Sequence, residues 1–320
     1  MLYYLRGMCI YTCKYKFGVD IMTLSEEILE LKRKNNALIL AHYYQRPEVQ
    51  DIADVVGDSY YLSKYAFEST SQLIIFCGVK FMAESVKILS PQKKVILPVY
   101  DAGCPMADMV DETKLIELKE KYKDAAVVCY INSSTEVKAL CDVCVTSSNA
   151  IKIISKIKAK NIIFLPDKNL GGYLQERFPE KNFILWNGFC VTHQKVRVDN
   201  IKKSKEAIKD AQVLVHPECE KKVRDMADFI GSTGEIIDYA TSSKNKNFLI
   251  VTEEGVLREL KRKNPNKNFY FPQVMSCVNM KKTRLEDVRN SLINQEEITI
   301  DEEIRLKALS ALTKMHEMAR

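Results

Sequence analysis

One sequence pattern occurs three times along the 320 residues, and this repeat limits the folds open to the chain. The copies begin with the apolar runs NALILAHYY, DAAVVCYINS and AQVLVHPE. They end at Cys104, Cys190 and Cys277, which are separated by 86 and 87 residues. Each cysteine is expected directly after a buried strand, formed by the apolar run at 94–99, 182–186 or 269–274. A period of that length exceeds a solenoid unit and fits small domains. We therefore expect three similar domains in a pseudo-threefold arrangement, with the three cysteines meeting at its centre.

Each copy shows the same order of features. First comes an apolar run that ends in a polar residue, then a helical stretch that contains an aspartate, then a small polar turn. A second apolar run, a helix and a third apolar run follow and lead to the cysteine. Equivalent residues are His42, Asn132 and His216 at the end of the first run, Asp54, Asp142 and Asp228 in the helical stretch, and Gly57-Asp58-Ser59, Thr146-Ser147-Ser148 and Gly231-Ser232-Thr233 in the turn. Short β-branched runs alternating with helices predict an α/β fold of small parallel-sheet αβα domains.

The repeat also suggests domain boundaries. Residues 1–21 lack the apolar core and cleavage site of a signal peptide, and a better helix follows them with Thr23 or Ser25 as its cap. We expect a non-essential extension at 1–21, α/β domains at 22–110, 111–196 and 197–285, and a C-terminal helical segment at 286–320 that packs on the domains.

The composition excludes several classes of protein. The apolar fraction is 46% and the charged fraction 28%, and no apolar run approaches the roughly 18 residues of a membrane helix. The net charge of +6 arises from basic runs that acidic residues nearly balance, so we expect no nucleic-acid partner. Ten cysteines without a secretory signal indicate a reducing compartment, and we expect a cytoplasmic protein without disulfides.

Polar side chains follow the apolar runs where parallel strands would end. Ligands collect at the carboxyl ends of such strands, so we expect one cavity lined by the three cysteines and by His42, Tyr44, Tyr130, Asn132, His193, His216 and Glu218. Three thiolates suit a zinc ion or three corners of a 4Fe-4S cluster, with one metal position open for Lewis-acid catalysis. The hydroxyls of the equivalent turns either cap helices or hold carboxylate and phosphate oxygens: Ser59, Ser147, Ser232 and Thr233.

The remaining cysteines are interpreted as packing residues. The Cys141-x-x-Cys144 pair has redox or zinc spacing, but it lies in a helix-to-turn segment without a second pair. The same interpretation applies to cysteines inside apolar strands or after a turn, namely Cys77, Cys129 and Cys219, whereas Cys9 and Cys13 belong to the N-terminal extension. His316 is interpreted as a surface or helix-end residue.

Several longer segments carry a family resemblance: LAHYYQRPEVQDIADVVGDS, GVKFMAES, GCPMAD, YINSSTEVKALCDV, PDKNLGGY, WNGFCVTH, VHPECEKKVRDMADFIGSTG and MSCVNMKK. Through them the chain resembles the quinolinate synthases, iron–sulfur enzymes of NAD biosynthesis, from about Leu38 to Arg284. The resemblance implies a 4Fe-4S cluster with one open iron, held by Cys104, Cys190 and Cys277.

The resemblance further implies condensation of iminoaspartate with dihydroxyacetone phosphate to quinolinate, with loss of phosphate and water, and functional coupling to L-aspartate oxidase. The implied substrate-binding positions are His42, Ser59, Tyr130, Asn132, Ser147, His193, His216, Glu218, Ser232 and Thr233. The expected catalytic residues are Tyr44, Glu218, His216 and His193. Two other interpretations stay open: an electron-transfer or sensor protein that carries the cluster without turnover, and a zinc lyase.

Overall fold

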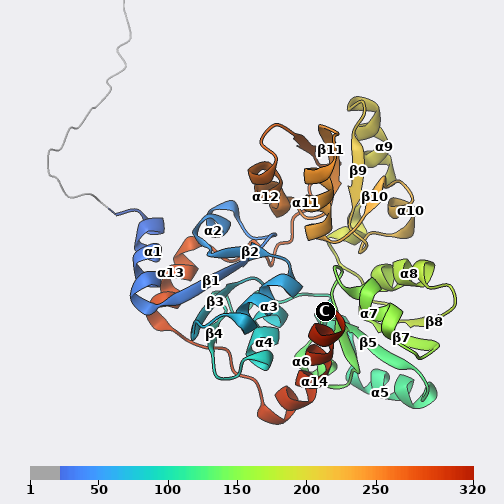
Figure 1. Ribbon diagram of the computed structural model, residues 1–320, viewed down its shortest axis with the longest axis horizontal. Coiled ribbons are helices and arrows are strands. Elements are labelled where there is room, and N and C mark those ends of the chain that lie inside the picture. The colour runs from blue at the N-terminus through green and yellow to red at the C-terminus, as the bar shows by residue number, and fades with distance from the viewer. Residues whose placement is uncertain (1–21) are drawn as a thin grey trace, which may run out of the picture.

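The computed structural model describes residues 22–320, which form three lobes around a common centre (Figure 1). Each lobe contains a four-stranded parallel sheet flanked by helices, in the strand orders β2-β1-β3-β4, β6-β5-β7-β8 and β10-β9-β11-β12. The predicted α/β fold with three similar αβα units is confirmed. The expected extension lies outside the described residues, and the domain limits at residues 110, 196 and 285 stay a prediction.

The elements follow one another in the same order in each lobe. The first lobe contains α1 (Leu24–Asn35), β1 (Ala37–His42), α2 (Pro47–Ile52), β2 (Val55–Gly57), α3 (Ser59–Glu68), β3 (Leu73–Cys77), α4 (Lys80–Leu89) and β4 (Lys94–Ile96). The second contains α5 (Glu112–Lys121), β5 (Ala126–Tyr130), α6 (Thr135–Ala139), β6 (Val143–Val145), α7 (Ala150–Lys156), β7 (Asn161–Leu165), α8 (Lys168–Arg177) and β8 (Asn182–Leu185). The third contains α9 (Val198–Ala207), β9 (Gln212–Val215), α10 (Lys221–Arg224), β10 (Phe229–Ile230), α11 (Thr233–Ser242), β11 (Asn247–Val251), α12 (Leu257–Lys263) and β12 (Asn268–Tyr270).

The three repeated aspartates make one contact three times. Their Oδ2 atoms accept the backbone N–H of a residue near the start of the first strand of each lobe: Asp54 from Ile39 at 2.9 Å, Asp142 from Val127 at 2.7 Å and Asp228 from Val213 at 2.7 Å. Each helix ends before its aspartate, and a short strand follows it (β2, β6 or β10). The prediction that the aspartates lie in helices was wrong. The strands that follow them have only two or three residues, too few to show the alternation of apolar and polar side chains by which a strand is recognised in a sequence.

The third apolar run of each copy forms an edge strand that is shorter than predicted. In β12, for example, Asn268 and Tyr270 are exposed and only Phe269 is buried. An edge strand has hydrogen-bonding neighbours on one side only, so the chain leaves it early. The cysteines therefore lie in loops beyond β4, β8 and β12, and the prediction that they directly follow buried strands was wrong.

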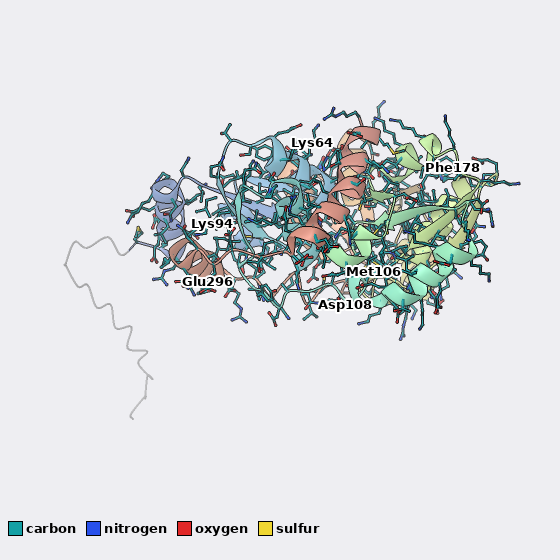
Figure 2. All side chains as sticks on the ribbon, turned by 90° about the horizontal axis from the view of Figure 1, so that it is seen from below. Lys64, Lys94, Met106, Asp108, Phe178 and Glu296 are labelled. Carbon is teal, nitrogen blue, oxygen red and sulfur yellow. The ribbon has the colours of Figure 1, made fainter. Side chains whose placement is uncertain are left out.

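Two C-terminal helices pack on the lobes. α13 (Leu285–Asn294) lies against α1, where the Asn35 side chain donates to the carbonyl of Leu292 at 2.9 Å. α14 (Glu302–Met318) packs against α4 of the first lobe and α6 of the second. Figure 2 shows it between the lobe that carries Lys94 and the lobe that carries Phe178. Within residues 22–320, none of the helices combines the length and the apolar character that a membrane crossing requires.

Candidate active site

A cavity lies where the carboxyl ends of the strands from all three lobes meet. In each sheet the second strand of the chain lies on one side of the first strand and the third strand lies on the other side. The crevices between β1 and β3, β5 and β7, and β9 and β11 are therefore topological switch points. The cavity has a volume of about 80 Å³. One water needs only ~10–15 Å³ by this measure, so the cavity has room for a small molecule or several waters.

The structure brings the sequence-predicted residues together with one exception. The cavity is lined by His42, Tyr44, Ser59, Cys104, Tyr130, Asn132, Ser147, Cys190, His193, His216, Glu218, Thr233 and Cys277. Ser232 does not line it; its Oγ caps α11 by accepting the backbone N–H of Glu235 at 3.3 Å. Glu253 also lines the cavity, although the sequence analysis did not identify it.

The three repeat cysteines are partly exposed and face this cavity, one from each lobe or its following loop. Burial raises the pKa of Cys104 to about 12, and the nearby Cys277 adds to the rise. Burial also raises the pKa of Cys190, with a contribution from Glu218 and a smaller one from Cys104. Thiols that are this hard to ionise in the free protein become thiolates when a metal supplies the compensating positive charge.

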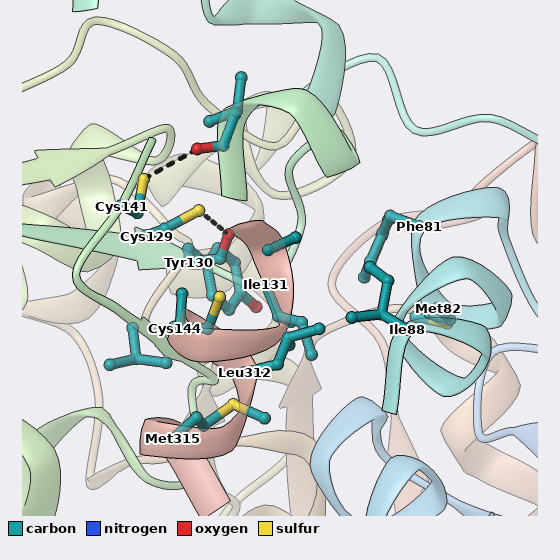
Figure 3. Packing of buried hydrophobic residues seen from close by; sticks show 14 of the residues in the cluster. Phe81, Met82, Ile88, Cys129, Tyr130, Ile131, Cys141, Cys144, Leu312 and Met315 are labelled. Atoms are coloured by element: carbon teal, nitrogen blue, oxygen red, sulfur yellow. Dashed lines mark hydrogen bonds between the residues drawn. The ribbon is translucent and has the colours of Figure 1, made fainter. Parts of the chain in front are cut away.

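The other cysteines of the described residues are buried away from the cavity: Cys77, Cys129, Cys141, Cys144 and Cys219. Cys144 belongs to strand β6 and stands opposite Cys129 of β5, so its predicted place in a helix-to-turn segment was wrong. Figure 3 shows these two cysteines and Cys141 in the same hydrophobic cluster as Leu312 and Met315 of α14, a cluster shared by the first two lobes.

Glu218 is the centre of a buried hydrogen-bond network. Its Oε1 accepts from the Tyr130 hydroxyl at 2.7 Å, and its Oε2 lies 2.8 Å from Nδ1 of His193. Burial alone would raise the pKa of Glu218, but the adjacent His216 and His193 rings, together with the hydrogen bonds from His193 and Tyr130, hold it below its ordinary value. Glu218 is therefore a carboxylate at neutral pH, which is the form a general base needs.

Thr252 extends this network into the first lobe. Its Oγ1 lies 3.0 Å from Nε2 of His193 and 2.9 Å from the Tyr44 hydroxyl, which in turn lies 2.7 Å from Oγ1 of Thr233. Because Nδ1 of His193 faces the Glu218 carboxylate, Nδ1 carries the proton and Nε2 accepts the Thr252 hydroxyl. The sequence does not mark Thr252, because a threonine directly after an ordinary buried strand carries no local signal.

Two further histidines adopt the opposite tautomer. Nδ1 of His42 accepts the backbone N–H of Tyr44 at 3.1 Å, and Nδ1 of His216 accepts that of Glu218 at 3.3 Å. Burial lowers the pKa of both rings to about 3, so both are neutral at pH 7 and carry their proton on Nε2. Each ring thus presents an N–H donor while its other nitrogen is fixed by the backbone.

Three further polar features of the cavity, as described for residues 22–320, concern Asn132, two helix starts and Tyr44. Asn132 has a buried Oδ1 without a hydrogen-bond partner. Ser59 and Thr233 are the first residues of the ten-residue helices α3 and α11, whose N-terminal N–H groups favour anions. Burial and the neighbouring Glu218 raise the pKa of Tyr44 well above its ordinary value, so its phenol remains protonated.

One group of ligand atoms within residues 22–320 is close enough to hold a single metal ion. The sulfur of Cys190, a nitrogen of His193 and an oxygen of Glu218 all lie within 4.8 Å of one another. The sulfurs of the three repeat cysteines do not form such a group, although all three line the same cavity.

The fold and the cavity define an α/β protein of three sheets with cysteines and acid–base residues at its centre. Comparison with known proteins identifies the family. A family model described as "Quinolinate synthetase A protein" matches residues 26–317. The chain is 57% identical over 298 residues to the quinolinate synthase of Clostridioides difficile, which covers 92% of this chain and 98% of the relative. For the quinolinate synthase of Clostridium acetobutylicum the identity is 59% over 299 residues, 93% and 99% of the two chains. The chain belongs to the quinolinate synthase family, as its sequence motifs predicted, and is an enzyme.

Proposed function

We propose that this enzyme condenses iminoaspartate with dihydroxyacetone phosphate to quinolinate, with loss of phosphate and water, in NAD biosynthesis. The observation that carries the proposal is the convergence of three cysteines and an acid–base network from three lobes on one cavity, in a chain of this family. We further propose a cytoplasmic location and functional coupling to L-aspartate oxidase as the source of iminoaspartate.

The proposed cofactor is a 4Fe-4S cluster held by Cys104, Cys190 and Cys277, and the donor set supports it. Three thiols line the cavity, and no fourth cysteine of residues 22–320 does. Zinc–sulfur bonds of about 2.3 Å place two sulfurs of one ion no more than about 4.6 Å apart. The three cysteine sulfurs are not all within 4.8 Å of one another, so they are too far apart for all three to bind a single zinc ion in this structure. When bound, a cluster with one iron free of protein ligands supplies a Lewis acid that polarises a substrate oxygen.

The side chains of the cavity suit two anionic substrates. His42 and His216 offer neutral Nε2–H donors, and the hydroxyls of Ser59, Ser147 and Thr233 provide further donors. The N-termini of α3 and α11 add positive electrostatic potential next to Ser59 and Thr233. These groups can hold the carboxylates of iminoaspartate and the phosphate of the triose without requiring a buried positive charge.

Proton transfer is assigned to Glu218 and Tyr44. Glu218 is ionised, buried and oriented by Tyr130 and His193, so it can take a proton from a substrate carbon. Tyr44 keeps its proton at neutral pH and can donate it to a substrate oxygen. The chain of contacts through Thr252 and His193 connects the two groups, which allows their protonation states to be restored between steps.

Substitution of Glu218 by Gln tests the proposal. The change preserves size and removes the base, so we expect a full iron and sulfide content with turnover reduced by about 10²–10⁴. Glu220, which pairs with Lys222 at 2.7 Å and does not line the cavity, provides the matched control: Glu220→Gln should turn over normally. Near-normal quinolinate formation by Glu218→Gln would contradict the assignment and direct the search for the base to His193 and His216.

The alternatives differ in the cofactor and in turnover. An electron-transfer or sensor protein would show the broad visible absorption of an iron–sulfur cluster but would form no quinolinate from the two substrates under anaerobic conditions. A zinc lyase, for which Cys190, His193 and Glu218 would be the ligands, would show no such absorption. The visible spectrum of anaerobically purified protein, followed by a turnover assay, separates the three functions.

A further inference from the structure

Two buried carboxylates occupy equivalent places in the second and third lobes. Asp167 and Glu253 each lie two residues beyond the second strand of the switch point, β7 or β11, and both are 0% exposed. One oxygen of each carboxylate binds the start of the next helical segment. Oδ1 of Asp167 accepts the N–H groups of Asn169 and Leu170 at 2.7 and 2.8 Å, and Oε2 of Glu253 accepts that of Gly255 at 2.6 Å.

The second oxygen of each carboxylate binds the backbone of a repeat cysteine. Oδ2 of Asp167 accepts the N–H of Cys190 at 3.2 Å, and Oε1 of Glu253 accepts the N–H of Cys277 at 3.0 Å. The Glu253 carboxylate also pairs with Lys281, whose Nζ lies 3.1 Å from Oε1. Each carboxylate thus connects the loop that carries a cysteine to a helical segment anchored in the lobe.

The first lobe provides an internal comparison. There the equivalent residue, two positions beyond β3, is Val79, which is buried but has no hydrogen-bonding group. It precedes α4, which has no side-chain cap. Capping alone does not explain the two carboxylates, because the exposed Asp111 caps α5 without reaching any cysteine. Burial raises the pKa of both side chains, and the backbone N–H groups bound by their oxygens oppose that rise by stabilising the ionised form.

We propose that Asp167 and Glu253 are positioning residues for the metal centre: they hold the backbones of Cys190 and Cys277 so that both thiols face the cavity before a cluster binds. The inference rests on the proposed cluster. A ligand loop that is already ordered loses less conformational freedom on binding, and groups that orient metal ligands in this way typically change affinity about 10–100-fold when removed. Neither residue is assigned a part in proton transfer.

Cluster retention in the full-length holoprotein tests the inference. Asp167→Asn and Glu253→Gln preserve size but place an N–H₂ group where the second oxygen accepted a backbone N–H. We expect each variant to lose iron to a chelator ~10–100 times faster than the unsubstituted protein. Asp111→Asn changes an exposed helix cap that binds the N–H of Lys114 and no cysteine backbone, so this variant should lose iron at the normal rate. Rates for both variants within twofold of normal would overturn the inference.

A second measurement covers the case in which a variant assembles no cluster. Amide hydrogen exchange of the purified full chain, followed by mass spectrometry, should show faster exchange at Cys190 in Asp167→Asn and at Cys277 in Glu253→Gln, with the Cys104 loop unchanged. Unchanged exchange at both cysteines would refute the anchoring. If the unsubstituted protein takes up no iron and sulfide, the proposed cofactor is wrong. If the unsubstituted protein binds a full cluster and both variants lose iron and exchange amide hydrogens at its rates, only the positioning role of Asp167 and Glu253 is wrong.

Discussion

Replacement of Thr252 by Val removes a single hydroxyl from the centre of the molecule and nearly preserves the shape of the side chain. In the structure that hydroxyl links Tyr44 of the first lobe to His193 of the second, from a strand end of the third. Thr252 is fully buried, so solvent water does not take the place of the lost hydroxyl. We expect the variant to fold less stably and to turn over more slowly, with an unchanged iron content.

The magnitude follows from the two contacts. Tyr44 retains its hydrogen bond to Thr233, whereas Nε2 of His193 loses its donor and stays buried. A hydrogen bond contributes about 0.5–1.5 kcal/mol net, and an unpaired buried acceptor costs about 1–3 kcal/mol. We therefore expect the free energy of unfolding to fall by about 2 kcal/mol, roughly a 30-fold change in the folding equilibrium constant.

Urea unfolding provides the assay, because the chain has one tryptophan, Trp186, whose fluorescence reports on the second lobe, while circular dichroism reports on all three. Thr252→Ser keeps the hydroxyl and is the matched control; it should recover most of the stability and the turnover. The reasoning is refuted if Thr252→Val is as stable as the unsubstituted protein, or if Thr252→Ser is destabilised equally.

Three further outcomes are expected. Cys190→Ser should abolish iron binding while Cys144→Ser leaves it intact, since only the first faces the cavity; iron analysis after anaerobic reconstitution decides, and the reverse result would contradict the ligand assignment. Asp142→Ala should lower the free energy of unfolding by ~1 kcal/mol, because the Val127 N–H loses its acceptor, and urea titration measures it. Burial lowers the pKa of His316 to about 4, so its stabilising contribution is complete above the unfolded value of about 6.5 and is lost as the pH falls toward 4. His316→Gln should therefore lose less stability between pH 7 and 5 than the unsubstituted protein; equal losses would refute this.

His316 also shows the limit of residue-by-residue interpretation. It lies in the last turn of α14, consistent with the predicted helix end, but it is half-buried: its ring stacks on Tyr60 at 5.3 Å and its Nε2 lies 3.3 Å from Oγ of Ser63. The sequence shows that α14 has an apolar face. It does not show which helix covers that face, because the contact joins residues about 250 positions apart.

The local pattern of the chain determined the parts that depend on near neighbours. Apolar runs of four to six residues produced the two central strands of each sheet, β1 and β3, β5 and β7, and β9 and β11. The repeat predicted that the polar ends of the first of these strands, such as His42 and His216, are equivalent. The family resemblance extended this to most residues that line the cavity. These predictions succeeded because strand burial and strand ends are encoded within a few residues.

Only the tertiary structure decided strand order, and with it the roles of residues that have no local signature. Thr252 and Glu253 follow an ordinary buried strand, and nothing in their neighbourhood marks them. They reach the cavity because β11 pairs beside β9 in the sheet, which places the ends of both strands at one switch point. That pairing, like the meeting of Tyr44, His193 and Thr252 from three lobes, is a long-range contact, and long-range contacts are set by packing of the whole chain and not by the residues next to each position.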